Sequence, residues 1–375
     1  MTSEDQKRVV IKIGSSSLTS LSGDISRRKM ERLTDQVVQL KDQGHEVVLV
    51  SSGAVAAGYR TLGFVSRPSS LPEKQAAAAV GQGRLIESYA ELFSSHGYAA
   101  SQILITRSDF SDETRYNNVR NTINVLLERG IVPIVNENDT VTTDRLRFGD
   151  NDTLSAKVAG LVASDQLIIL SDIDGLYNAD PRKDPSAELL KEVTEITEDI
   201  EDMAGEPGSA VGTGGMRSKI DAFKISMASG IPSFLGRSGV HNILIDAVNE
   251  EARGTYFEVK EPELNLNHKR QWIAFNSGPE GEILIQDDAK TAIIDDKENL
   301  HPSQIYQVNG YFKKGSVVRI LDLNKNKLGL GMVNYSSTDL KNFQRENEEQ
   351  SDSTVAVVHS ESFVCELEVA IPIGV

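Results

Sequence analysis

Carboxylate and amide side chains are concentrated in one short part of the chain, at Asn136, Asn138, Asp139, Asp150, Asn151 and Asp152. Side chains of these types suit two kinds of chemistry. They grip an amine and a carboxylate together, or they position lysines and a metal ion around phosphates. The alternative is a polar loop made of Asx turns and a helix cap, and this stretch alone leaves both interpretations open.

Lys12 stands inside an apolar β run that ends at Gly14 and Ser15. One interpretation places it on an edge strand, or lets its ammonium group reach water beyond its apolar stem. The other makes it a cation at the strand end, beside backbone N–H groups that bind phosphate oxygens. The motif is not a Walker loop, because the glycine-to-lysine spacing of that loop is missing.

Ser52, Gly53 and Ala54 directly follow the next apolar run. Small residues at this point let a ligand approach the backbone and the N-terminus of the following helix, which attracts anions. A tight turn between a strand and a helix would explain the same residues. The pattern differs from the nucleophile elbow of the α/β-hydrolases, so the segment does not indicate that class of enzyme.

Two later segments suit a nucleotide pocket. Ser171 and Asp172 follow another apolar run, where acidic residues also act as turn formers, and Tyr177 is near enough to wall a pocket. Residues 211–219 form a glycine-rich loop that opens a helix and ends at Lys219. Backbone N–H groups in such a loop, together with the lysine, suit phosphates. A glycine-rich loop alone is a weak signal, and the two segments together are a stronger one.

The elements that must position these residues alternate between strand and helix. Apolar strands are expected at residues 8–15, 46–51, 101–107, 131–136 and 166–172. Helices are expected at residues 26–43, 73–95, 114–129 and 154–163. Continuous apolar strands separated by helices predict an α/β fold with a mainly parallel sheet covered on both faces, a three-layer αβα sandwich. Ligands gather at the carboxyl ends of such strands, where the polar segments lie.

The pattern changes near residue 260. A polar linker with a proline is expected over residues 261–275, between a first domain at 1–260 and a second at 276–375. In the second domain helical periodicity fades, and short β runs alternate with turn signals. These runs, at residues 281–286, 305–308, 316–322, 328–334 and 354–360, predict a small β-rich domain of barrel or sandwich type.

Composition narrows the possible functions. The 375 residues carry a formal net charge of −16, which opposes nonspecific nucleic-acid binding. The single cysteine, Cys365, rules out an intrachain disulfide, and one free thiol fits a reducing cytoplasm. We expect this thiol to be buried in an apolar strand. The apolar runs are too short to span a bilayer, and the N-terminus lacks the apolar segment of a signal peptide.

Taken together, the motifs resemble the amino acid kinase superfamily and, within it, the glutamate 5-kinase family. The similarity covers nearly the whole chain and rests on residues 10–15, 50–54, 132–139, 148–156, 171–177 and 212–219. The pair at 132–139 and 148–156 is the most discriminating. The C-terminal segment resembles a PUA domain, which occurs in RNA-modifying enzymes and is appended to many bacterial members of this family.

The resemblance implies a role for each matched residue. Lys12 and Lys219 approach the transferred phosphoryl group from either side, and Asp152 holds both lysines in place. The residues implied in glutamate binding are Ser52, Gly53, Asp139, Asp150 and Asn151. Those implied at the ATP site are Lys12, Ser171, Asp172, Thr213, Gly214, Gly215, Met216, Arg217, Ser218 and Lys219. No protein ligand is assigned to Mg²⁺, because phosphates and water largely hold this ion in such sites.

The resemblance also implies an activity and partners. The activity is ATP- and Mg²⁺-dependent phosphorylation of the γ-carboxylate of L-glutamate, the first step of proline biosynthesis, with feedback inhibition by proline. The implied partners are glutamate-5-semialdehyde dehydrogenase and further copies of the chain, as a homodimer or homotetramer. Another carboxylate-phosphorylating amino acid kinase and an RNA-binding PUA protein remain alternatives. Residues 276–375 carry nine Lys and Arg against sixteen Asp and Glu, a net charge of −7, whereas RNA binders present a basic face.

Overall fold

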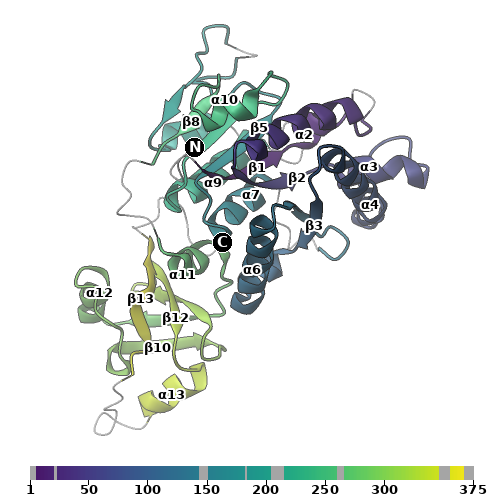
Figure 1. The fold of residues 1–375 in the computed structure, drawn as a ribbon. Coiled ribbons are helices and arrows are strands. Elements are labelled where there is room, and N and C mark those ends of the chain that lie inside the picture. Colours follow the sequence, from purple (N-terminus) through teal and green to yellow (C-terminus); the bar gives the residue numbers. More distant parts are fainter. Residues whose placement is uncertain are drawn as a thin grey trace. The chain divides into compact units, whose positions relative to one another are not determined.

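The computed structural model of the chain describes residues 6–20, 23–142, 151–181, 184–203, 215–259, 266–345 and 355–366 (Figure 1). The chain divides into two compact units. The N-terminal unit comprises Met1–Asp109 and Thr114–Pro262, and the C-terminal unit comprises Phe110–Glu113 and Glu263–Val375.

An eight-stranded sheet runs through the N-terminal unit in the order β3-β4-β2-β1-β5-β7-β8-β6. The strands are β1 (Arg8–Ile13), β2 (Glu46–Ser51), β3 (Ala100–Ile105), β4 (Val132–Glu137), β5 (Gln166–Ser171), β6 (Glu192–Val193), β7 (Ser233–Arg237) and β8 (Thr255–Phe257). Every neighbouring pair is parallel except β7 and β8. The prediction of a mainly parallel sheet is therefore confirmed, and β1 lies at its centre.

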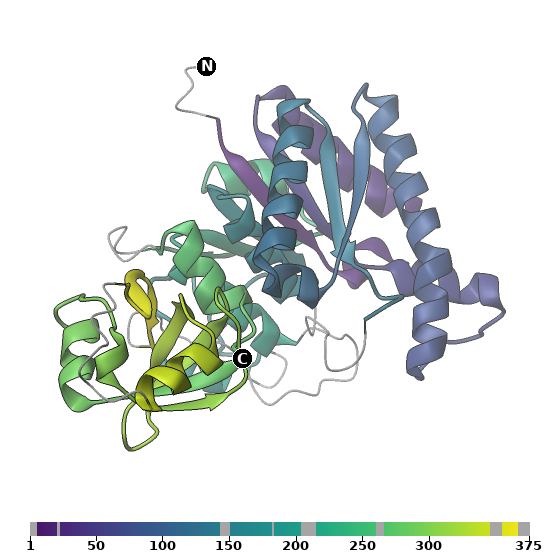
Figure 2. The same ribbon diagram turned by 90° about the horizontal axis from the view of Figure 1, so that it is seen from below.

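Helices cover both faces of this sheet, as Figure 2 shows. Along the chain from β1 to β8, the helices are α1 (Ser15–Leu18), α2 (Arg27–Asp42), α3 (Ala54–Gly58), α4 (Leu71–Ser95), α5 (Arg107–Ser111), α6 (Glu113–Glu128), α7 (Asn151–Leu161), α8 (Glu198–Met203), α9 (Met216–Ala228) and α10 (Ile243–Val248), with a 3₁₀ turn at Tyr59–Leu62. Helices α2, α4 and α10 bury their apolar stripes against one face of the sheet. Helix α7 packs on the other face against β1, β2, β4 and β5, with α9 beside it. This is the predicted three-layer arrangement.

Helix α7 begins earlier than its apolar pattern indicates. The small and apolar residues predict a start at residue 154, whereas the helix starts at Asn151. That prediction was wrong because the first turn of the helix is polar, and carboxylates are stabilised at a helix N-terminus by the helix dipole. The correction matters because it puts Asn151 and Asp152 on one rigid turn.

The C-terminal unit is built on a five-stranded sheet in the order β10-β9-β11-β12-β13. Its elements are a helix α11 (His268–Gln271) continued by a π-helical turn (Trp272–Asn276), β9 (Gly281–Ile285), α12 (Asp287–Ile294), a 3₁₀ turn (Pro302–Gln304), β10 (Ile305–Gly310), β11 (Val317–Leu321), β12 (Lys327–Val333), α13 (Ser337–Arg345) and β13 (Val358–Cys365). Only β9 and β11 pair in parallel. The β-rich prediction is confirmed.

Two details of this unit differ from the sequence pattern. Residues 268–275 of the expected linker are helical, and Trp272 is buried with its Nε1 donating to the carbonyl of Phe110 at 2.8 Å. The last strand covers Val358–Cys365, not 354–360, because pairing with β12 begins at Val358. Cys365 ends this strand with a buried thiol, as predicted. Among the described residues, no helix is long and apolar enough to cross a membrane.

Candidate active site

Lys12 enters the site from the central strand of the sheet. Strand β1 pairs with β2 on one side and β5 on the other, so the edge-strand interpretation is wrong. Alternation along the strand sends Ile11 and Ile13 into the core under α2, and Lys12 to the opposite face. Only 6% of Lys12 is exposed. A lysine this deeply buried requires a counter-charge.

That counter-charge is Asp152, in the first turn of α7 and fully buried. Its Oδ1 lies 2.5 Å from the Nζ of Lys12, and its Oδ2 lies 3.1 Å from the Nζ of Lys219. The Oγ of Ser218 also donates to Oδ2, at 3.0 Å. Lys219 comes from the first turn of α9, which packs beside α7. Three elements distant in sequence thus meet at one carboxylate.

The electrostatic balance of this triad favours an anion. Burial raises the pKa of the Asp152 carboxyl, but the charges and hydrogen bonds of Lys12 and Lys219 outweigh burial and hold that pKa below its usual range. The carboxylate is therefore ionised at neutral pH. Two ammonium groups thus converge on one carboxylate near the carboxyl ends of β1 and β5. Such a site can neutralise phosphate oxygens.

A second, uncharged cluster lies beside the triad on the same turn of α7. The Nδ2 of Asn151 donates to the carbonyl of Ser51 at 2.9 Å, to the Oγ of Ser52 at 3.0 Å and to the Oδ1 of Asn136 at 3.0 Å. Asn136 is 5% exposed, and its Oδ1 also accepts the backbone N–H of Glu137. The ends of β2 and β4 are therefore held to α7 by neutral hydrogen bonds.

The turn after β2 is shaped by glycine and by close packing. Gly53 has a φ of +105°, the left-handed region that glycine adopts without strain. Tyr89 of α4 lies beneath it, with its hydroxyl 3.0 Å from the Oγ of Ser51. Helix α3 crosses α4 at Gly58 and Gly81, where a Cβ on Gly81 would stand 1.7 Å from the carbonyl oxygen of Ala54. The Ser52 turn thus rests on a helix crossing that only glycine permits.

The structure places the other predicted site residues as follows. Ser171 ends β5, and its Oγ donates to the exposed Asp172 at 3.1 Å. Asp139 is half-buried in the turn after β4. Gly215, Met216, Arg217 and Ser218 form the N-terminal end of α9 up to Lys219. Asp150, Thr213 and Gly214 lie outside the described residues.

Sequence reasoning assigned no role to Asn136, Ser51 or Tyr89. Asn136 belongs to the polar cluster noted above, and the available signal was its position at the carboxyl end of a strand buried on both faces. A polar side chain there needs a hydrogen-bond partner. Ser51 and Tyr89 carry no comparable signal, because their contact joins residues 38 positions apart.

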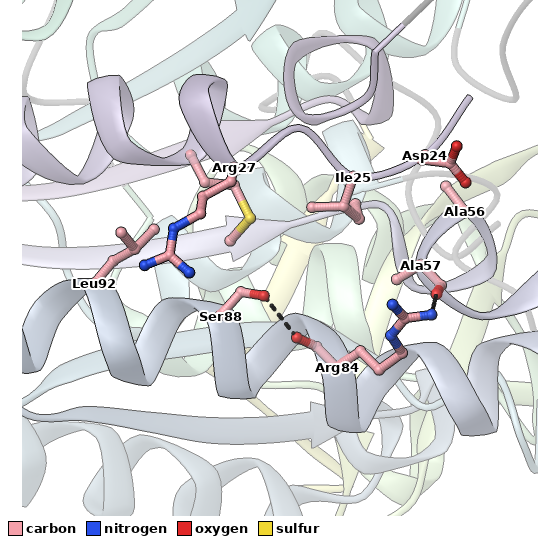
Figure 3. A pocket seen from close by; sticks show the side chains of 9 residues that line it. Asp24, Ile25, Arg27, Ala56, Ala57, Arg84, Ser88 and Leu92 are labelled. Atoms are coloured by element: carbon pink, nitrogen blue, oxygen red, sulfur yellow. Dashed lines mark hydrogen bonds between the residues drawn. The ribbon is translucent and has the colours of Figure 1, made fainter. Parts of the chain in front are cut away.

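A separate cavity of about 230 Å³ lies between α2, α3 and α4 (Figure 3). Arg84 reaches into it but donates to the carbonyl of Ala57 at 3.2 Å and to the Oγ of Thr61 at 2.6 Å. Arg27, on the opposite wall, pairs with Glu31 and Glu91. Because these arginines already have partners, we assign no ligand to this cavity.

The described residues contain no group of three acidic, histidine or cysteine side chains able to hold a metal ion. Mg²⁺ keeps several waters and binds phosphates readily, so a site with few protein ligands still suits it. Among the described residues, Lys12 and Lys219 place positive charge beside Asp152.

Comparisons with known proteins show what the chain is similar to. A family model described as the amino acid kinase family matches residues 7–236, and a PUA domain model matches residues 281–354. The chain is 64% identical over 374 residues to "Glutamate 5-kinase 2" of Bacillus licheniformis, covering 100% of both chains. It is 61% identical over 368 residues to "Glutamate 5-kinase 2" of Bacillus subtilis, covering 98% of each. It is 43% identical over 361 residues to "Glutamate 5-kinase 1" of Bacillus subtilis, covering 96% of this chain and 98% of that one.

Proposed function

This chain belongs to the amino acid kinase family and, within it, to the glutamate 5-kinases, and we propose that it transfers the γ-phosphoryl group of ATP to the γ-carboxylate of L-glutamate. The observation that carries this proposal is the pairing of Lys12 and Lys219 with the buried Asp152. The acceptor carboxylate is already ionised at neutral pH, so the reaction needs no general base. It needs alignment of the two reactants and neutralisation of charge on the phosphoryl group.

The two lysines suit that task because Asp152 fixes them before substrate arrives. Preorganised cations stabilise developing charge without reorganising during the reaction. Lys12 would face the transferred group from the β1 side and Lys219 from the α9 side. Asp152 would not touch substrate in this scheme, and it acts by keeping both ammonium groups in position.

We assign glutamate to the neutral side of the site. The proposed contacts are Ser52, Gly53, Asp139, Asp150 and Asn151. A carboxylate such as Asp139 suits the α-ammonium group of the substrate, and the amide of Asn151 suits a carboxylate. Asn136 would orient the amide, since its Oδ1 accepts from the Nδ2 of Asn151.

We assign ATP to the carboxyl ends of β1 and β5 and to the start of α9, at Lys12, Ser171, Asp172 and residues 213–219. The first turn of α9 presents backbone N–H groups that suit phosphates. Mg²⁺ would be held by phosphate oxygens and water, and when bound it would neutralise part of the phosphate charge.

A direct assay tests the proposal. The full chain is incubated with ATP, Mg²⁺ and L-glutamate, and the acyl phosphate is trapped with hydroxylamine. We expect hydroxamate with L-glutamate, and little with aspartate or N-acetylglutamate. Lys219→Met should lower kcat by roughly 10²–10³-fold, whereas Lys191→Met, at an exposed lysine, should not change it. Product with another carboxylate but none with glutamate would overturn the substrate assignment.

The pathway role is a finer part of the proposal. The product of the proposed reaction is an acyl phosphate, which hydrolyses readily. It therefore suits immediate use by glutamate-5-semialdehyde dehydrogenase, in the first steps of proline biosynthesis. Proline would inhibit at the glutamate side, and the same assay with added proline tests this. We place the reaction in the cytoplasm, with the chain acting as a homodimer or homotetramer.

We also propose that residues 1–260 carry the kinase activity and that residues 276–375 form the PUA domain after a connecting segment. The net charge of −7 over residues 276–375 argues against an RNA-binding function. A salt-dependent shift of RNA at low protein concentration would overturn that part.

A further inference from the structure

Helix α8 carries four acidic residues, and one of them differs from the rest. Glu198, Asp199 and Asp202 are exposed, whereas the side chain of Glu201 is 22% exposed and faces α9. Its Oε2 accepts from the Nη2 of Arg217 at 2.9 Å, and its Oε1 accepts from the Nζ of Lys224. A single carboxylate thus joins α8 to two turns of α9.

The two cations lie on one face of α9. Arg217 and Lys224 are seven residues apart, which is two helical turns or about 10 Å along the axis. The side chain of Lys224 is only 7% exposed, and its ion pair with Glu201 offsets part of the cost of burying a charge. Arg217 is 44% exposed and has a second, longer contact to Asp221 at 3.7 Å. The four side chains balance in charge, and we call them the α8–α9 clasp.

The clasp adjoins the first turn of α9, which carries the proposed catalytic residue Lys219. Arg217 precedes Ser218 and Lys219, whose side chains both bind Asp152. The first turn of α9 is therefore held on one side by Asp152 and on the other by Glu201. Glu201 and Arg217 also stand on either side of residues 204–214 in the sequence, which contain part of the glycine-rich loop assigned to ATP.

We propose that Glu201 is a positioning residue for ATP binding, because it anchors Arg217 and so fixes the phosphate-binding turn of α9. This inference rests on the proposed function, in that ATP is the ligand of this turn. Glu201 does not touch substrate in this scheme. Its effect should therefore appear in the affinity for ATP and leave the glutamate side of the site unchanged.

The first test compares Glu201→Gln with Asp202→Asn, a matched loss of one negative charge at an exposed position of the same helix. ATP affinity is measured by calorimetry on the full chain with Mg²⁺, and KM is measured for both substrates. We expect Glu201→Gln to weaken ATP binding roughly tenfold, as loss of one well-placed charged hydrogen bond does. The KM for glutamate should stay within about twofold, and Asp202→Asn should match the parent.

A second variant separates positioning from stability. Glu201→Gln leaves Lys224 charged and buried without this partner, so the unfolding midpoint should fall. In Glu201→Gln/Lys224→Met that buried charge is gone, which removes the cost of leaving one member of a buried ion pair without its partner. We expect the double variant to recover the midpoint of the parent but to keep the weakened ATP binding, because Arg217 still lacks its anchor.

Two outcomes would overturn the inference. One is a lower unfolding midpoint in Glu201→Gln with unchanged ATP affinity, and the other is recovery of both properties in the double variant. Either would make the clasp purely structural. Because calorimetry needs no turnover, a parent chain that binds ATP without forming glutamyl phosphate would contradict the proposed reaction and leave the clasp testable. A parent chain that does not bind ATP would overturn both.

Discussion

The site has a charged side around Asp152 and a neutral side around Asn151, and different interactions hold the two sides together. Asp152 binds Lys12 and Lys219 through buried charges, whereas Asn151 holds the ends of β2 and β4 through neutral hydrogen bonds. Adjacent residues on a helix point about 100° apart, so one turn of α7 serves both sides. The charged side suits charge neutralisation, and the neutral side suits orientation of a small polar substrate.

The difference teaches how sensitive each side should be to substitution. Removing one member of a buried ionic group leaves uncompensated charges, which costs far more than losing one neutral hydrogen bond. A single substitution on the charged side should therefore cause a large loss of activity, whereas one on the neutral side should cause a smaller loss of substrate affinity. Substitutions at the two sides, taken in order of expected effect, test this contrast.

The largest effect is expected for Asp152→Asn. An amide cannot hold two lysines by charge, so both ammonium groups should move apart and leave the transferred phosphoryl group unsupported. We expect kcat to fall by roughly 10²–10³-fold, the range for loss of a preorganised transition-state stabiliser. Asp199→Asn, at an exposed acid, is the control for charge alone. Near-normal turnover in Asp152→Asn would contradict the proposal that the charge of Asp152 holds the two lysines in place.

The next largest effect is expected for Gly81→Ala, which changes only the packing beneath the neutral side. In Gly81→Ala a methyl group would collide with the carbonyl oxygen of Ala54, at the start of α3. We expect a loss of about 1–3 kcal/mol in stability, typical of overpacking, together with a raised KM for glutamate as the Ser52 turn moves. Urea denaturation and initial rates measure the two quantities.

Gly83→Ala on the same helix is the matched control, because nothing lies within 4 Å of its Cβ position. It should stabilise the helix by about 0.5–1 kcal/mol, since alanine is the better helix former. Equal behaviour of the two variants would mean that the α3–α4 crossing does not support the site.

These contacts mark the boundary of what the sequence predicts. The motifs that contain Lys12, Asp152 and Lys219 can be recognised in the sequence, and the apolar runs around them predict the parallel sheet. That the three side chains meet at the carboxyl ends of the strands is therefore predictable. Their roles remain predictions. The crossing at Gly81 and the bond from Asn151 to Ser51 are not predictable in this way. The latter joins residues 100 positions apart, and nothing local to either residue indicates the other.

The start of α7 and the α8–α9 clasp show the same limit. The apolar pattern that reveals a helix begins at Leu154, so it does not report the polar first turn that carries the site. Four acidic residues in α8 look alike in sequence, and only the packing of α9 distinguishes Glu201 from its neighbours. Local pattern predicts elements, whereas partner choice depends on the tertiary fold.

A smaller effect is expected for Asn136→Ala. This change removes the Oδ1 that accepts from Asn151 and from the backbone of Glu137, but it removes no charge. We expect the KM for glutamate to rise roughly tenfold, the size of one neutral hydrogen bond, because the bond that orients Asn151 is lost, and kcat to change only a few-fold. Asn249→Ala, at an exposed position, is the control. A fall in kcat as deep as that of Asp152→Asn would remove the contrast between the two sides.

The last test leaves substrate binding aside and concerns a second buried ionisable residue on α7, Lys157. Burial, with a smaller contribution from the nearby Arg107, lowers the pKa of Lys157 from 10.5 to about 7. Asp152 keeps its charge at neutral pH because lysines surround it, whereas Lys157 should lose its charge just above neutrality. Between about pH 7 and 10 the unfolded chain then holds a proton that the folded chain lacks, so stability should rise with pH in this window.

The measurement is the difference in unfolding free energy between the parent and Lys157→Met at pH 7, 8 and 9, by urea denaturation. The parent should gain on the variant as pH rises, by at most about 1.4 kcal/mol per pH unit. Lys191→Met, at an exposed lysine, should show no such trend. A difference that is constant over this range would mean that Lys157 keeps its proton, and that α7 holds a cation outside the Asp152 triad as firmly as it holds the charges inside it.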